Sequence, residues 1–309
     1  MLSLVLMEKI LSLFIVILCG FIIVRLGILK AEDSKIISLV LLWIVYPAVT
    51  LAAFQIENTG DEMKNILATI VIGFFINVGY VFLAKALRKP LKLNPAEESS
   101  MVYSNAGNLL VPLVTMLFGS EYVIYTMGYM SIQTFGIWGN AKRMISGEKK
   151  INYKELFLNV NIISVFIGFI FFALNIKFPP IIGDSIQMLS NMVGPGSMLI
   201  VGMIIGGMDL KRLFTFKRLL IPTAFRLFVF PIICTILLKI SNVASLLPDG
   251  EKIILILLLG ASGPVASMIT QFSQLYSSKE ESEYASAINV VSTLLCVISM
   301  PLMVYIFQI

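Results

Sequence analysis

The chain has 309 residues, of which 58% are hydrophobic and 13% charged, and its mean hydropathy is +0.93. Soluble domains carry roughly a quarter charged residues, so the composition excludes a soluble globular protein and predicts an all-α polytopic membrane protein. The formal net charge of +5 does not indicate a nucleic-acid partner, because the basic residues fall in short loops between apolar runs, as membrane orientation signals do.

Ten apolar segments follow one another along the chain, and a membrane-spanning helix needs roughly 20 residues. We therefore expect ten transmembrane helices. Their approximate ranges are 10–29, 35–55, 65–87, 99–119, 121–141, 156–176, 186–208, 217–240, 252–275 and 284–307. No small-residue cleavage site follows the first apolar run before Arg25, so we expect the first helix to be retained.

Most lysine and arginine residues lie in the loops after the first, third, fifth, seventh and ninth segments. The positive-inside rule then predicts that these loops are cytoplasmic, in a plasma or inner membrane, and that both termini face outward. The short basic loop 142–155 separates two halves, 1–141 and 156–309, with five segments each. Because five is odd, the second half must enter the membrane in the opposite direction, and repeated halves would be inverted.

The prolines support such a repeat. Pro47 and Pro112 in the first half have almost the same spacing as Pro195 and Pro264 in the second half. Two segments interrupted by glycine and proline at corresponding places in inverted halves point to the binding site of a transporter. The alternative is that these prolines only kink ordinary membrane helices, in which they are common.

The fourth segment is interrupted by the sequence SNAGNLLVP, which contains Asn105, Gly107, Asn108 and Pro112. Two amides, a glycine and a proline at that depth leave polar groups in hydrocarbon. Such a break is tolerated only where it is buried in protein or lines a water-filled cavity. We therefore expect this break to form part of a functional site.

The ninth segment carries the matching interruption, GASGPVAS, with Ser262, Gly263, Pro264 and Ser267. Each break exposes backbone N–H groups at the start of a half-helix, where the partial charge is positive. Two such ends meeting near the membrane midplane would form a site for an anion.

Several side chains extend this candidate substrate site. The amides of Asn105 and Asn108 and the hydroxyls of Ser262 and Ser267 can donate hydrogen bonds to a carboxylate. Gln133 in the fifth segment and Asn289 in the tenth are further candidates, since they lie in the segments that follow the two breaks.

Ionisable residues are rare within the segments, and Arg226 is the clearest interior charge. It either attracts an anion or ties the ends of neighbouring helices together, and we favour the second interpretation. No aspartate or glutamate lies in the middle of any segment, which disfavours cation exchange. We expect no cofactor and no metal site. Sodium and a proton both stay open as coupling ions.

The chain resembles the auxin efflux carrier family in the broad sense, which includes plant PIN-type carriers and bacterial malonate and malate permeases. The resemblance is most specific at Asn105 and Pro112, around Pro264, and from Ala285 to Pro301. It covers essentially all ten segments. At Asn108 the family usually has an apolar residue, and at Leu110 it commonly has glycine.

The resemblance implies a fold of two inverted five-helix repeats, like that of bile-acid symporters and sodium/proton antiporters, in which broken helices four and nine cross. Segments one, two, six and seven would form a scaffold, and the other six a moving transport domain. It also implies that the cargo is an organic anion and that Asn105 holds its carboxylate.

We therefore predict a secondary transporter of a small mono- or dicarboxylate, auxin-like or malate- and malonate-like, that works by alternating access with an elevator-like movement. The alternatives are a sodium- or proton-coupled symporter of another amphipathic acid, and a sensor or channel with the same fold. An intramembrane enzyme is disfavoured, because no nucleophile with a base, carboxylate pair or metal cluster lies in the segments. The lipid bilayer is the expected partner, nucleic acid is not, and a homodimer stays open.

Overall fold

Helices make up nearly all of the regular structure in the computed structural model, which describes residues 2–209, 211 and 215–309. Within these residues, extended backbone pairing is limited to one isolated antiparallel bridge, between Ser104 and Val265. The prediction of an all-helical polytopic membrane protein is confirmed in these general terms.

In the first half, the helices and short helical turns follow the predicted order. They are α1 (Leu2–Arg25), η1 (Ala31–Asp33), α2 (Ser34–Val40), η2 (Leu41–Val45), α3 (Tyr46–Ala53), α4 (Asp61–Leu91), α5 (Pro95–Val102), η3 (Ala106–Leu110), α6 (Val111–Phe118), η4 (Ser120–Tyr122), α7 (Val123–Gly136), η5 (Ile137–Ala141) and α8 (Lys142–Ser146).

The second half continues in the same manner. Its elements are α9 (Tyr153–Phe157), α10 (Val160–Ala173), α11 (Pro180–Ser190), α12 (Val193–Gly207), α14 (Leu220–Ala224), η6 (Phe225–Val229), α15 (Phe230–Ile240), η7 (Val243–Leu246), α16 (Gly250–Ser262), α17 (Ser267–Tyr276) and α18 (Lys279–Gln308).

Six helices in the described part of the chain are long and apolar enough to cross a membrane. They are Ser3–Arg25, Ala31–Ala53, Asp61–Leu91, Pro180–Gly207, Leu220–Ile240 and Lys279–Gln308, and two shorter apolar helices are Ala106–Phe118 and Val160–Ala173. The count of ten spans stays a prediction, because the fourth and ninth segments are each divided into shorter helices and the fifth and sixth segments are not among these six.

Wide π-helical turns occur where proline interrupts a span. The turns η2, η3 and η6 directly precede the helices that contain Pro47, Pro112 and Pro231 near their starts. A proline removes one backbone donor, and its ring clashes with the carbonyl of the preceding turn, so the wider turn accommodates it. These prolines therefore reshape their spans without ending them.

The stretch predicted as the loop 142–155 is partly helical. The fifth span continues through α8 and ends at Gly147, whose φ of +73° is the left-handed conformation that favours glycine at a helix end. The short helix α9 follows before the sixth span begins. The boundary prediction missed α8 because its charged residues Lys142 and Arg143 look like loop residues in a sequence.

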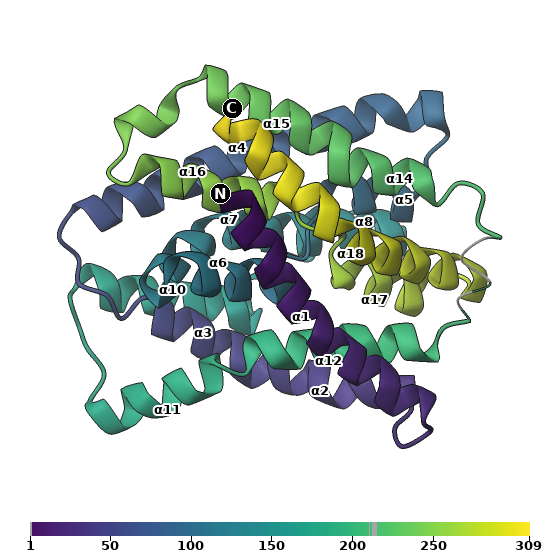
Figure 1. Ribbon diagram of the computed structural model, residues 1–309, viewed down its shortest axis with the longest axis horizontal. Coiled ribbons are helices and arrows are strands. Elements are labelled where there is room, and N and C mark those ends of the chain that lie inside the picture. Colours follow the sequence, from purple (N-terminus) through teal and green to yellow (C-terminus); the bar gives the residue numbers. More distant parts are fainter. Residues whose placement is uncertain (1, 210, 212–214) are drawn as a thin grey trace.

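The elements form two groups in Figure 1. Helices α2, α3, α11 and α12 lie in the lower part of the view, and α4, α14, α15 and α16 in the upper part. Helix α1 packs along α12, and their backbones approach so closely that a Cβ added at Gly202 would lie 2.0 Å from the carbonyl oxygen of Ile17. Glycine is therefore required where these two helices cross.

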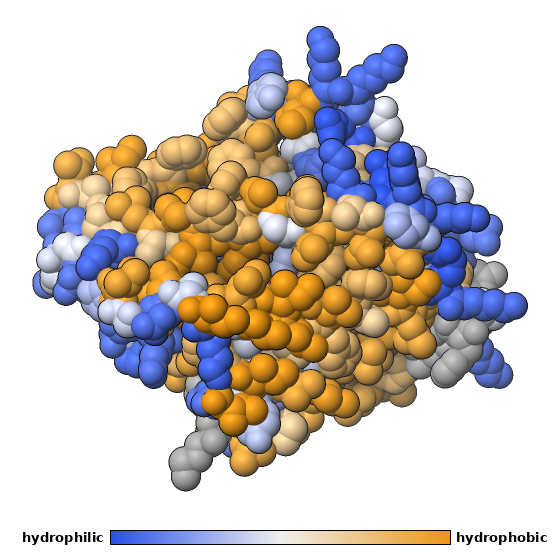
Figure 2. All heavy atoms as spheres, turned by 90° about the horizontal axis from the view of Figure 1, so that it is seen from above, coloured by the Kyte–Doolittle hydropathy of each residue, from blue (hydrophilic) through white to orange (hydrophobic). Residues whose placement is uncertain are grey.

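Figure 2 shows one side of the molecule, on which a broad apolar surface separates hydrophilic residues gathered at two ends. Large apolar side chains such as Phe82 and Ile15 are exposed on long helices. A soluble protein rarely exposes a contiguous apolar surface of this kind. This distribution is typical of a membrane protein whose apolar middle part lies in the bilayer.

Candidate functional site

The two predicted breaks meet in the interior of the molecule. The backbone N–H of Asn105 donates to the carbonyl oxygen of Pro264 at 2.8 Å, and that of Ala266 donates to the carbonyl oxygen of Tyr103 at 3.0 Å. These bonds flank the antiparallel bridge between Ser104 and Val265. Each break thus satisfies backbone groups of the other, which hydrocarbon could not do.

Arg226 lies behind this crossing and is completely buried. Its guanidinium donates to three carbonyl oxygens, those of Gly263 at 2.9 Å, Val102 at 2.9 Å and Ala261 at 2.8 Å, and it lies 5.6 Å from the ring centre of Tyr80. These carbonyls belong to the C-terminal ends of α5 and α16, where the helix dipole is negative. The interpretation of Arg226 as a tie between helix ends is confirmed.

The span after each break supports it from the side. The N–H of Ser104 donates to Oε1 of Gln133 at 3.1 Å, and Nε2 of Gln133 donates to the hydroxyl of Tyr129 at 3.0 Å. In the second half, Nδ2 of Asn289 donates to the carbonyl oxygen of Val265 at 2.8 Å. Gln133 and Asn289 therefore hold the backbone of the crossing.

Two half-helices begin directly after the crossing. One begins at Ala106 and continues as the apolar helix Ala106–Phe118, and the other is the start of α17. Neither of the residues before them, Asn105 and Ala266, caps the helix with a side-chain hydrogen bond. The first N–H groups of both helices are thus left to another partner, and the local charge is positive.

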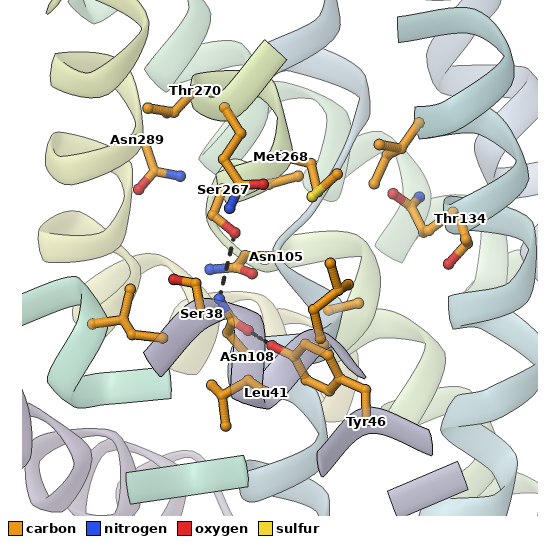
Figure 3. A pocket seen from close by; sticks show the side chains of 18 of the residues that line it. Ser38, Leu41, Tyr46, Asn105, Asn108, Thr134, Ser267, Met268, Thr270 and Asn289 are labelled. Atoms are coloured by element: carbon orange, nitrogen blue, oxygen red, sulfur yellow. Dashed lines mark hydrogen bonds between the residues drawn. The ribbon is translucent and has the colours of Figure 1, made fainter. Parts of the chain in front are cut away.

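A cavity of about 1280 Å³ extends from these N-termini to η1, to the segment that follows α12, and to the adjoining ends of α17 and α18. Its inner end is lined by Asn105, Gly107, Asn108 and Ser267, and the figure shows Asn105, Asn108 and Ser267 converging there (Figure 3). Its walls are mostly apolar, and they include Val49, Ile70, Met130, Trp138, Val165, Phe169 and Ile204.

Asn108 connects three elements at the inner end. The hydroxyl of Tyr46 in α3 donates to its Oδ1 in a close contact, and the hydroxyl of Ser197 in α12 approaches the same oxygen at 3.3 Å. Its Nδ2 lies 3.4 Å from the hydroxyl oxygen of Ser267 in α17. Asn108 thereby links α3 and α12, which lie in the lower part of Figure 1, to the start of α17.

Asn105 differs from Asn108 although both are buried beside the same cavity. Its side-chain amide has no hydrogen-bond partner among the residues that the structure describes, whereas all three contacts above go to Asn108. An unpaired amide beside two uncapped helix N-termini can donate to a ligand without first breaking a protein contact.

Six of the ten predicted site residues line the cavity: Asn105, Gly107, Asn108, Gln133, Ser267 and Asn289. The other four shape the crossing. Pro112 packs within α6, Ser262 donates to the carbonyl of Leu258 at 2.7 Å, and the carbonyls of Gly263 and Pro264 accept from Arg226 and Asn105.

Tyr46 and Ser197, which contact Asn108, are not among the residues predicted from the sequence. A signal was present, because Tyr46 precedes Pro47 and Ser197 lies two residues after Pro195, the prolines that mark the repeat. Those prolines served only to align the two halves. Polar residues next to an intramembrane proline were not considered as site residues.

Within the described residues there is no group of three or more His, Cys, Asp or Glu side chains that could hold a metal ion. The arrangement instead offers uncapped N–H groups, amides and hydroxyls. These are donors and neutral dipoles suited to an anionic group.

A family model described as a membrane transport protein matches residues 5–154 and 140–304 of the chain. The two matches together cover most of its length and include both breaks. A comparison with curated proteins gives no match.

Proposed function

Because the chain belongs to this family of membrane transport proteins, as its resemblance to the auxin efflux carriers predicts, we propose that it is a secondary transporter of small organic anions. The single observation that carries this proposal is the unpaired amide of Asn105 between two uncapped helix N-termini at the inner end of a large cavity.

The distribution of charge around the cavity favours an anion as cargo. The acidic residues that line it, Glu32, Asp209 and Glu283, lie in or next to the connecting loops, far along the chain from the breaks. At the inner end the polar groups are amides, hydroxyls and backbone N–H groups. A carboxylate there meets donors and positive helix ends without a competing acid.

The walls favour an apolar body on that carboxylate. Phe169, Val165 and Ile70 belong to the apolar lining of the cavity. Burying apolar surface contributes roughly 25 cal/mol per Å², whereas a second carboxylate against these walls would lose its hydration without a partner. We therefore favour amphipathic monocarboxylates over dicarboxylates.

Alternating access gives the two groups of elements separate roles. In this proposal α1, α2, α3, α10, α11 and α12 form a scaffold, and the elements that carry the crossing move past it. The cavity reaches loops predicted to be cytoplasmic, so this form of the protein is the inward-facing one. The contacts of Asn108 with Tyr46 and Ser197 link the two groups and must break when they move.

Counterflow in proteoliposomes tests the proposal. The proteoliposomes are preloaded with an unlabelled monocarboxylate that carries an aromatic or branched group. The uptake of the same acid in labelled form is then measured. We expect uptake of such acids to exceed that of dicarboxylates of similar size and of the corresponding uncharged amides. Conversion of Asn105 to alanine should abolish most of it.

The matched control is Asn191→Ala, because Asn191 is an exposed asparagine at the junction of α11 and α12. It should transport as the unchanged protein does. Absence of counterflow for every organic anion, with monodisperse protein and both cation gradients supplied, would contradict the proposal.

A further inference from the structure

A second, smaller cavity of about 420 Å³ lies beside the central one. It is bordered by Leu42 and Trp43 of η2, by Trp138 of η5, and by the segment that carries Asn152, Lys154 and Asn159. We call it the interface groove. Leu42 and Trp138 also line the central cavity, so the two spaces share a wall.

The segment between α8 and α10 forms one side of the groove by folding back along the fifth span. The rings of Phe135 and Phe157 lie 6.0 Å apart, and Ile151 lies beside Gly139, with 3.8 Å between its Cδ1 and a Cβ added at Gly139. Lys154 therefore lies beside the apolar residues of the fifth span and not beyond the end of that span.

The lining of the groove is amphipathic. Its apolar part includes Trp43, 60% exposed, and Leu158, 62% exposed, on the outer surface. Its polar part is formed by Asn152, Lys154 and Asn159. Trp43 lies near the middle of the apolar helix Ala31–Ala53, so this exposed apolar part of the groove lies at the depth of acyl chains.

The charge of the surrounding segment is unbalanced. Residues 142–155 contain five basic residues and two acidic ones in the sequence. The ammonium group of Lys154 forms no ion pair with another described residue. A lysine at this level in a membrane protein reaches water or binds a negatively charged group.

We propose that the interface groove binds an anionic phospholipid, with its phosphate at Lys154 and an acyl chain against Trp43 and Leu158. Basic residues next to a membrane span attract anionic lipids, and the apolar part of the groove accepts a chain that a soluble anion lacks. The bound lipid would pack against the wall formed by Leu42 and Trp138, and would thereby support the central cavity from outside.

The tryptophan content allows a direct test, because the chain has two tryptophans and both border the groove. The protein is reconstituted with phosphatidylcholine and increasing fractions of phosphatidylglycerol. In one series the phosphatidylcholine carries dibrominated chains, and in the other the phosphatidylglycerol does. Bromine quenches nearby tryptophan fluorescence, and the two brominated series give the relative association constant of the anionic lipid. Trp43→Phe and Trp138→Phe assign the signal to one ring.

We expect the anionic lipid to bind about fivefold more tightly than phosphatidylcholine, the factor that corresponds to roughly one lysine near a lipid surface. In Lys154→Gln this preference should disappear. In Lys64→Gln, which removes an exposed lysine at the start of α4, it should be unchanged.

Equal binding of both lipids by the unchanged protein would overturn the proposal. A preference that Lys154→Gln retains, or that Lys64→Gln loses equally, would also overturn it, since the attraction would then come from the whole charge of the protein. Size-exclusion profiles of both variants establish that they are folded, and both substitutions are on exposed side chains.

Discussion

The two broken spans have the same backbone arrangement but different side chains. Each ends a half-helix near Arg226, pairs with the other through one donated N–H bond, and begins a second half-helix without a side-chain cap. The first break, however, brings two asparagines to the cavity, whereas the second brings alanine and serine. The shared features build the crossing, and under the proposed function the differing ones recognise the cargo.

The outer ends of the two spans differ as well. Glu97 at the start of α5 is buried and contacts Arg218 at 3.1 Å and the hydroxyl of Tyr284 at 2.8 Å. Near the start of α16, Asp249 and Lys252 lie 3.8 Å apart and are both largely exposed. The first broken span is therefore anchored by a buried carboxylate and the second by a solvated pair.

The largest effect should come from the feature that both breaks share. Arg226→Met leaves the buried carbonyls of Val102 and Gly263 without this donor, while that of Ala261 keeps a contact of 3.4 Å with the hydroxyl of Tyr80. We expect a loss of about 3 kcal/mol of stability, since each unsatisfied group costs roughly 1–3 kcal/mol. The apparent melting temperature in detergent measures it. Arg143→Met removes an arginine with one long contact to Asn140, at 3.5 Å, and should change little. Equal effects of the two substitutions would contradict the assigned role of Arg226.

The second effect tests the difference between the outer ends. Glu97→Ala removes a buried acceptor from Arg218 and Tyr284 and from the backbone N–H of Asn94. We expect it to cost about 2 kcal/mol, given the partial exposure of Arg218. Asp249→Asn should cost less than about 0.5 kcal/mol, as exposed pairs do. Thermal unfolding of both variants measures the two losses of stability. A larger loss in Asp249→Asn than in Glu97→Ala would contradict the difference between the two spans.

The third prediction tests the chemical asymmetry. Asn105→Ala should weaken the binding of a transported acid by about 1–3 kcal/mol, because a buried charge then lacks one donor. Ser267→Ala, at the corresponding place after the second break, should cost less than about 1 kcal/mol. Binding isotherms with the best acid from counterflow provide both values. Equal losses would mean that the two breaks share recognition.

The smallest effect concerns the link between the two groups of elements. Tyr46→Phe removes the hydroxyl that contacts Asn108, and we expect about 1 kcal/mol of destabilisation, the typical contribution of one hydrogen bond. A double-mutant cycle with Asn108→Ala should show a coupling of similar size. A coupling near zero would indicate that the close contact contributes nothing to the stability of this conformation.

Much of the fold could be predicted from local patterns. The apolar segments, the basic loops and the interruptions at Asn105 and Pro264 are properties of neighbouring residues, so they are visible along a single chain. The boundaries were less accurate at α8, where Lys142 and Arg143 continue the fifth span, and at α10, which begins only after its N-cap Asn159. Gly147 ends the fifth span, and its positive φ becomes apparent only in the structure.

The candidate site could be predicted only in part. Asn105 and Asn108 are conspicuous because amides in a span are costly unless they serve a purpose. Gln133 and Asn289 stay predicted substrate contacts: they line the cavity, and their side-chain amides also bond to the backbone of the breaks. Tyr46 and Ser197 were missed because nothing local distinguishes them from other polar residues in helices.

The sequence by itself determined that the protein is helical, lies in a membrane and carries two matched interruptions, because hydropathy and the conformational limits of glycine and proline act over a few residues. Only the tertiary structure decided how the interruptions are used. It placed Asn105 against Pro264, Arg226 on the carbonyls of both half-helices, and Tyr46 beside Asn108. These contacts join residues far apart in the chain, and such pairings follow from packing geometry that no local pattern encodes.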